Sequence, residues 1–68
     1  MDKKSRNIYK NARQTAGLTQ ERWAELLGIS ADSVRRYESG QLRPGDDIVL
    51  SMAETTGILV LPLWHLRA

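Results

Sequence analysis

The sequence predicts an all-α fold, a compact bundle of four to five short helices. Helix caps and helix-ending glycines recur along the chain at intervals that fit short helices. Strand signals are nearly absent, because the one strand-like run, ILVLPLW, is too short to build a sheet. The chain has 68 residues and no cysteine. It is therefore expected to form one domain, residues 1–68, whose core has no disulfide to support it.

The first helix is expected from about Ser5 to Ala16. Ile8 and Ala12 recur with Ala16 at four-residue spacing, which places them on one face of a helix. Gly17 follows, and glycine most easily adopts the left-handed conformation that ends a helix. A short amphipathic helix of this kind must bury its apolar face against the rest of the bundle.

The second and third helices have the clearest ends. Thr19 is a good N-cap, Glu21 suits the positive end of the helix dipole, and Gly28 ends the second helix. Ser30 caps the third helix and Gly40 closes it. The inward positions of these helices and their link are expected to hold Trp23, Ala24, Leu27, Ile29, Val34 and Tyr37.

A fourth helix is expected to begin at Asp46 and Asp47, where acids favour the positive end of the dipole, and to end at Gly57. Its apolar spacing runs through Ile48 or Val49, Met52, Ala53 and Thr56. Pro62 fits the first position of a short fifth helix, which is the least clearly marked of the five.

The link between the second and third helices consists of Gly28 and Ile29 alone, with Ser30 as the next cap. So short a link forces a tight, angled pair of helices. Where they cross, one helix must present a small side chain. Ala24 does so, and Val34 is placed to fill the corner. With the other apolar positions in phase, the pattern predicts a helix-turn-helix.

The third helix carries an unusual outward face. Val34 and Tyr37 share its inner side, whereas Asp32, Arg35 and Arg36 point the other way. Taken alone, such a face is more often simply solvated. In a helix-turn-helix, however, the outward face of the second helix of the pair contacts DNA. The motif therefore favours DNA contact over a merely solvated face. Asp32 also suits the first turn of any helix, so its role stays open.

The stretch LTQERWAELLGISADSVRRYESGQLRPGDDIVLSMAETTG resembles the lambda-repressor and Cro type (Xre-like) of helix-turn-helix domain. The likeness runs without a gap from Arg13 to Gly57, about two thirds of the chain. The matching marker positions are Gln20, Ala24, Gly28, Val34, Glu38, Gly40, Pro44 and Ala53. The sequence departs from the family at Trp23, where leucine is usual. It also departs at Asp46 and Thr56, which are more often apolar.

The resemblance implies specific roles for individual residues. Gln20 is expected to bond a DNA phosphate and to brace the third helix, which enters the major groove by its N-terminal part. The residues expected at base edges and the groove wall are Ala31, Asp32, Ser33, Arg35 and Arg36. Gln41 and Arg43 are expected against the DNA backbone. Glu38 resembles the family glutamate that pairs with an arginine of the first helix, here Arg13.

The chemistry of the outward residues fits the reading of bases. An arginine donates two hydrogen bonds to O6 and N7 of guanine. Asp32 is able to accept a hydrogen bond from N4 of cytosine, or to orient a neighbouring arginine.

The net charge is +2 and is unevenly distributed. Positions 1–16 hold one acid against Lys3, Lys4, Arg6, Lys10 and Arg13. Positions 46–68 hold Arg67 against Asp46, Asp47 and Glu54. A basic pole on a small domain favours a polyanion, and double-stranded DNA is the partner expected here.

Catalysis, cofactor binding and metal binding are not expected. His65 is the only histidine and cysteine is absent, so neither a catalytic triad nor a zinc site can be assembled. Asp46 and Asp47 are expected to be a capping pair, and His65 is expected at the surface. The longest apolar run, Ile58 to Trp64, is too short to span a bilayer. No membrane partner or small-molecule ligand is expected, and the expected setting is cytoplasmic.

The segment from Ile58 to Leu66 has more apolar side chains than so small a domain is expected to bury. These are Ile58, Leu59, Val60, Leu61, Leu63, Trp64 and Leu66. Some are expected to stay exposed and to form a dimer seam centred on Leu63 and Trp64. Alternatively, residues 58–68 begin a downstream region.

The sequence as a whole favours a sequence-specific transcriptional regulator of repressor type, which occupies an operator as a homodimer. One alternative is an antitoxin, or the DNA-binding part of a larger mobile-element protein. Another is a protein-interaction module that has kept the fold and lost DNA binding. The arginines of the third helix argue against this last alternative, whereas Asp32 leaves room for it.

Overall fold

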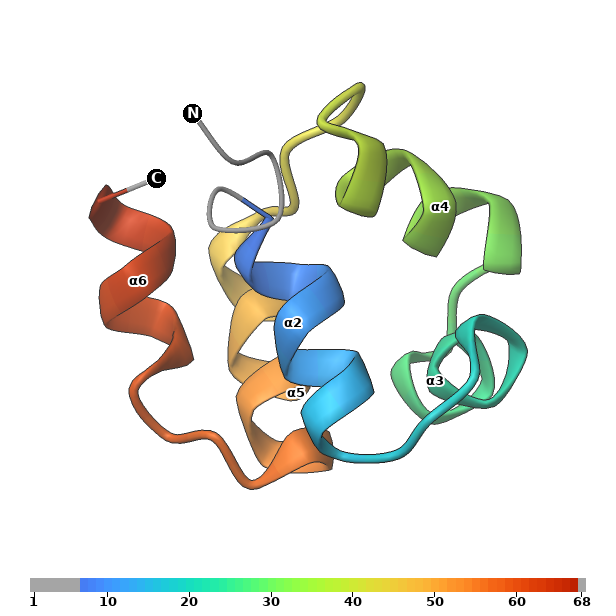
Figure 1. The fold of residues 1–68 in the computed structure, drawn as a ribbon. Coiled ribbons are helices and arrows are strands. Elements are labelled where there is room, and N and C mark those ends of the chain that lie inside the picture. Colours follow the sequence, from blue (N-terminus) through green and yellow to red (C-terminus); the bar gives the residue numbers. More distant parts are fainter. Residues whose placement is uncertain (1–6, 68) are drawn as a thin grey trace.

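The computed structural model describes residues 7–67 of the chain, and Figure 1 shows the fold. This part is all-helical, as predicted, with five α-helices and no strand among the described residues. The helices, labelled as in Figure 1, are α2 (Ile8–Thr15), α3 (Gln20–Leu27), α4 (Ala31–Ser39), α5 (Asp46–Thr56) and α6 (Leu61–Arg67).

Helices α2 and α5 lie side by side at the centre of the molecule, and the other three pack around them (Figure 1). On one side α3 and α4 form a packed pair, in which α3 also contacts α5 and α4 also contacts α2. On the other side α6 packs against α2 and α5. The α3–α4 pair and α6 therefore occupy opposite sides of the bundle.

The core draws apolar residues from all five helices. Its buried members among the described residues are Tyr9, Ala12, Trp23, Ala24, Val34, Tyr37, Val49, Met52, Ala53 and Leu61. The predicted core positions Trp23, Tyr37 and Met52 are confirmed. Trp23 is fully buried, and its Nε1 donates a hydrogen bond of 2.8 Å to Oγ1 of Thr55 on α5. The large ring is therefore accommodated without an unsatisfied donor.

The first predicted helix begins later than expected, at Ile8 rather than near Ser5, which lies outside the described residues. The reason is a cap that the sequence interpretation missed. Oδ1 of Asn7 accepts from the backbone N–H of Lys10 at 2.8 Å. Its Nδ2 also donates to the carbonyl of Glu38, so the same amide ties the start of α2 to the end of α4.

Helix α5 begins at Asp46 as predicted, but the two acids do not cap it. Gly45 is the N-cap and makes no side-chain cap bond, so Asp46 and Asp47 act only as first-turn acids. At the other end, Thr56 is half-buried, and its Oγ1 donates 2.7 Å to the carbonyl of Met52. The hydroxyl at this usually apolar position is therefore satisfied within its own helix.

The fifth predicted helix is present, with Pro62 in its second position rather than its first. The expectation that His65 lies at the surface is wrong, since its residue is only 4% exposed. Leu61 and His65 are four residues apart and so share one helix face, which packs against α2 and α5. Nδ1 of His65 lies 2.8 Å from the Tyr9 hydroxyl, and Nε2 lies 3.4 Å from Oδ1 of Asp46.

Candidate nucleic-acid interface

The turn between α3 and α4 sets the direction of α4. Gly28 has φ of 72°, in the left-handed region where a side chain would be strained. The backbone N–H of Ile29 then donates 3.0 Å to the carbonyl of Ala24, which closes the end of α3. Oγ of Ser30 accepts from the N–H of Ser33 at 3.1 Å and starts α4 immediately. The two helices are thus joined by the short angled turn that the sequence predicts.

Helix α4 divides into an inner and an outer face. Val34 and Tyr37 are buried in the core. The side chains of Asp32, Arg35 and Arg36 are 52% to 57% exposed on the opposite face. Burial of the inner face therefore leaves the outer one presenting two cations and one anion.

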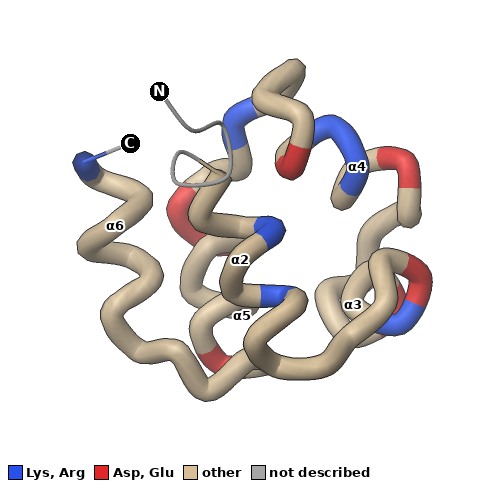
Figure 2. Tube along the Cα trace, in the orientation of Figure 1, with Lys and Arg blue, Asp and Glu red and all other residues tan. Residues whose placement is uncertain are grey.

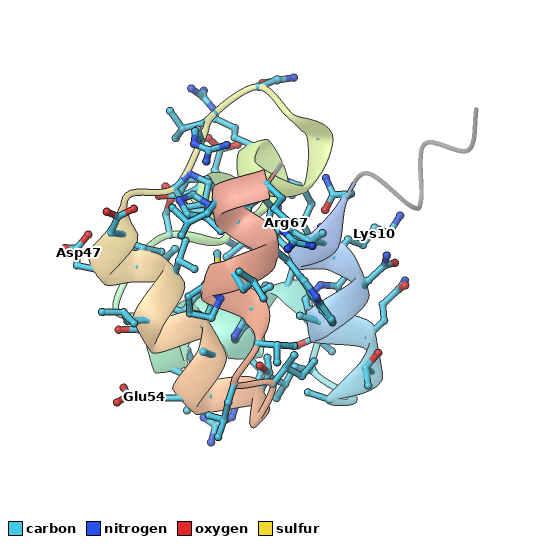
Figure 3. The ribbon with its side chains drawn as sticks, turned by 90° about the vertical axis from the view of Figure 1, so that its left-hand side faces the viewer. Lys10, Asp47, Glu54 and Arg67 are labelled. Atoms are coloured by element: carbon cyan, nitrogen blue, oxygen red, sulfur yellow. The ribbon has the colours of Figure 1, made fainter. Side chains whose placement is uncertain are left out.

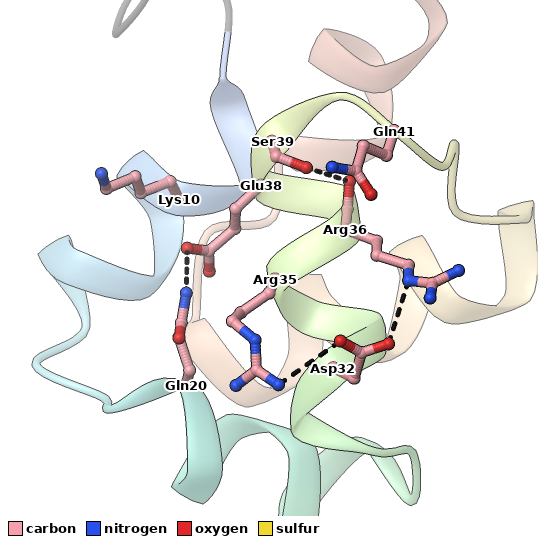
Figure 4. Close-up of a pocket in the computed structure, with 8 residues that line it drawn as sticks. All are labelled: Lys10, Gln20, Asp32, Arg35, Arg36, Glu38, Ser39 and Gln41. Atoms are coloured by element: carbon pink, nitrogen blue, oxygen red, sulfur yellow. Dashed lines mark hydrogen bonds and ion pairs between the residues drawn. The ribbon is translucent and has the colours of Figure 1, made fainter.

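This outer face forms one wall of an open concavity of about 510 Å³ between α2, α3 and α4. Figure 4 shows the side chains that line it, which are Lys10, Gln20, Asp32, Arg35, Arg36, Glu38, Ser39 and Gln41. Five of the residues predicted to contact DNA are brought together here, namely Gln20, Asp32, Arg35, Arg36 and Gln41. They come from α3, α4 and the segment that follows α4.

Asp32 bridges the two arginines of this face. Its Oδ2 lies 2.9 Å from Nε of Arg36, one helical turn ahead, and its Oδ1 lies 3.4 Å from Nη2 of Arg35. The two guanidinium groups lie on either side of the carboxylate (Figure 4). One acid thus contacts both cations on an otherwise solvent-exposed surface.

Glu38, which also lines the concavity, has a buried carboxylate that binds side chains from two other helices. Arg13 donates to it from Nε at 2.7 Å and from Nη2 at 3.1 Å. Gln20 donates from Nε2 at 3.1 Å to the same carboxylate. Nη1 of Arg13 also donates 2.8 Å to the carbonyl of Leu18. Glu38 therefore connects α2, the start of α3 and α4, and it sets the position of the Gln20 amide.

The remaining predicted DNA-contacting residues lie away from the concavity's lining. Ala31 is half-buried against the core. Ser33 is half-buried, with its Oγ 3.0 Å from Oγ of Ser30. Nη2 of Arg43 donates 2.7 Å to the carbonyl of His65, so this exposed arginine also ties the loop before α5 to α6.

Charge is mixed rather than uniform over the described residues. Figure 2 shows basic positions on α2, α3 and α4, in the segment after α4 and at the end of α6, with acidic positions on α3, α5 and near both ends of α4. The described range 7–67 has as many basic as acidic residues. The net charge of +2 therefore comes from positions 1–6, where Lys3, Lys4 and Arg6 lie outside the described residues.

Sequence reasoning missed the residues that join distant segments. Asn7 was open to recognition, because asparagine is a preferred N-cap. Its hydrogen bond to the carbonyl of Glu38, at the end of α4, could not be predicted from the residues near Asn7 in the sequence. The buried contact between Tyr9 and His65 spans 56 positions of the chain, and nothing in the spacing of residues indicated it.

Two negative findings concern the described residues only. No group of three or more histidine, cysteine, aspartate or glutamate side chains within 7–67 is arranged to hold a metal ion. None of the helices described there is long and apolar enough to cross a membrane.

A short angled helix pair that presents the cationic outer face of its second helix defines a helix-turn-helix protein, a class that indicates DNA binding. Residues 10–60 match the family described as helix-turn-helix domain, and the chain belongs to that family. This agrees with the resemblance to lambda-repressor and Cro type domains. No curated protein and no solved structure matches the chain.

Proposed function

We propose that the chain is a sequence-specific transcriptional regulator of repressor type, which acts in the cytoplasm by occupying an operator in double-stranded DNA. The observation that carries this proposal is the outer face of α4. Asp32, Arg35 and Arg36 are exposed there, beside an open concavity, on the helix that follows the turn. This is the helix that enters the major groove in helix-turn-helix proteins.

Affinity and specificity are assigned to different residues. Nε2 of Gln20 uses one N–H for Glu38, and its second N–H remains for a phosphate oxygen. Lys10 and Gln41 line the same concavity and suit further phosphate contacts. The arginines of α4 suit base edges and the groove wall, so this helix supplies the specificity. Ala31, Ser33 and Arg43 are proposed at the groove wall and backbone.

The protein is proposed to act as a homodimer through residues 58–66. The exposed apolar side chains of this segment are Leu59, Val60, Leu63, Trp64 and Leu66. They lie on α6 and just before it, on the opposite side of the bundle from the α3–α4 pair (Figure 1). Pairing there leaves both α4 helices free to reach half-sites about 34 Å apart on a pseudo-palindromic operator.

Selection of bound sequences from random duplex DNA tests the proposal. We expect enrichment of one short motif, repeated with two-fold symmetry at a spacing of about one DNA turn. A single unpaired motif would support DNA binding and contradict the dimer. Recovery of no preferred sequence would contradict the regulator and favour a protein-interaction module.

A further inference from the structure

The two arginines of α4 are held by Asp32 in different ways. Arg36 meets the carboxylate through Nε, with 2.9 Å between Nε and Oδ2. Arg35 meets it through Nη2, at 3.4 Å from Oδ1. The first contact is a close ion pair, and the second is a hydrogen bond that is longer than charge-assisted hydrogen bonds usually are. The two arginines therefore differ in which guanidinium nitrogens stay free.

We propose that Asp32 is a positioning residue that orients Arg36 to read a guanine, an inference that rests on the DNA-binding function proposed above. A guanidinium that is bound through Nε still carries two terminal nitrogens, Nη1 and Nη2. Both are bonded to Cζ on the side away from Nε, where they form a fork, and the ion pair with Asp32 is made through Nε instead. Guanine presents O6 and N7 side by side in the major groove, and the fork donates one hydrogen bond to each.

Arg35 is less suited to this role. Its bond to Asp32 uses Nη2, which is one of the two nitrogens that end-on reading of guanine needs. Its guanidinium also lies toward Gln20 (Figure 4), which is the proposed phosphate contact. Arg35 therefore fits a phosphate or a groove-wall contact, which adds affinity without discriminating among bases.

The Asp32–Arg36 pair is expected to orient the Arg36 side chain rather than to stabilise the folded protein. Both side chains are more than half exposed, and exposed ion pairs contribute little to folding. An arginine side chain is long and loses rotamer freedom when it binds, so holding it in advance lowers the cost of binding. The carboxylate has an opposing effect, because its negative charge repels DNA phosphates at any sequence.

Because of these two effects, Asp32→Ala is expected to change the affinity for the operator and the affinity for a random duplex in opposite directions. Binding to the selected operator is expected to weaken by about 2- to 10-fold, the range for ordering one long side chain. Binding to a random duplex is expected to strengthen, because one negative charge near the phosphates is gone. A loss of fold would weaken both, and it would also appear in thermal unfolding by circular dichroism.

The experiment compares wild type, Asp32→Ala, Arg36→Ala and the double variant on three duplexes. These are the selected operator, the operator with 7-deazaguanine at one guanine of each half-site in turn, and a random duplex. At the contacted guanine, wild type is expected to lose about 5-fold or more, because 7-deazaguanine has no N7 acceptor. This loss should shrink in Asp32→Ala and disappear in Arg36→Ala. In the double variant, Asp32→Ala should remove no further guanine preference.

Glu25→Ala is the matched control. Glu25 forms an exposed ion pair with Arg22 on α3, so its removal changes the charge equally but leaves α4 untouched. It is expected to leave the guanine preference at its wild-type value. An unchanged guanine preference in Asp32→Ala, with operator binding intact, would overturn the positioning role and leave the regulator standing. A wild-type protein that binds all three duplexes equally would overturn both.

Discussion

The guanidinium of Arg13 makes two hydrogen bonds to the carboxylate of Glu38, of 2.7 and 3.1 Å, and so joins α2 to α4 across 25 positions of the chain. The two side chains are 12% and 4% exposed. Within residues 7–67, Arg13→Ala leaves the buried carboxylate with only the Gln20 amide as a side-chain partner. We expect a loss of about 3–5 kcal/mol in the free energy of unfolding, measured by urea denaturation.

An exposed pair provides the control for this prediction. Arg22 and Glu25 lie 3.2 Å apart with side chains 60% and 70% exposed. Arg22→Ala is expected to cost no more than about 1 kcal/mol, because water solvates both charges. Equal losses for the two variants would show that Glu38 is not held by Arg13 in solution.

Alkaline pH is expected to weaken the docking of α6. Burial raises the pKa of the Tyr9 hydroxyl above its ordinary value, and the positive charge of Arg43 opposes the shift. A raised pKa means that the folded protein holds the proton more tightly than the unfolded chain. The resulting stabilisation is complete below about pH 10, the ordinary tyrosine pKa, and is lost as pH rises through the folded value.

The variant Tyr9→Phe isolates this effect. At neutral pH it leaves Nδ1 of His65 without its partner, at a cost of about 1–3 kcal/mol. Unfolding free energies of both proteins are measured from about pH 8 to about pH 11. The difference between wild type and variant should narrow above about pH 10. A constant difference throughout would contradict the role assigned to the hydroxyl.

DNA binding is expected to weaken steeply as salt rises. The logarithm of affinity falls with the logarithm of salt by about 0.9 for each phosphate neutralised. Lys10→Gln should therefore lower the slope by about one such step if Lys10 meets a phosphate. Glu54→Gln changes the net charge by one unit in the opposite direction, and Figure 3 shows Glu54 and Lys10 on opposite sides of the molecule. It should leave the slope unchanged. Changes of slope that are equal in size and opposite in sign would show an effect of net charge alone and would exclude a local contact of Lys10.

Self-association is expected to depend on Trp64. Its residue is 40% exposed on α6, beside other exposed apolar side chains. Sedimentation at micromolar and millimolar concentration should show a dimer for wild type and a monomer for Trp64→Ala. Leu26→Ala is the matched control, since Leu26 is 43% exposed on α3 and should not affect the equilibrium. A wild-type monomer at both concentrations would exclude the seam.

The helix-turn-helix illustrates what the spacing of residues was able to predict. Thr19, Gly28, Ser30 and Gly40 stand at the predicted helix ends, because caps and left-handed glycines act over three or four residues. The outer face of α4 was equally predictable, since helical periodicity separates it from Val34 and Tyr37.

The C-terminal segment illustrates the limit of such prediction. The apolar excess of residues 58–66 correctly indicated that some side chains remain exposed. It did not indicate that Leu61 and His65 are the buried ones. A lone histidine on a short amphipathic helix has no local signal for burial, because its partners Tyr9 and Asp46 come from α2 and α5.

By itself, the sequence determined the all-helical fold, the ends of α3 and α4, the angled turn between them and the identity of the residues on the outer face of α4. Each of these depends on neighbours a few positions away, whose geometry is set by the backbone. The tertiary structure alone decided that Asn7 binds the end of α4 and that the buried His65 binds the Tyr9 hydroxyl. These contacts join segments 31 and 56 positions apart, and such pairs meet only once the helices have packed around a common core.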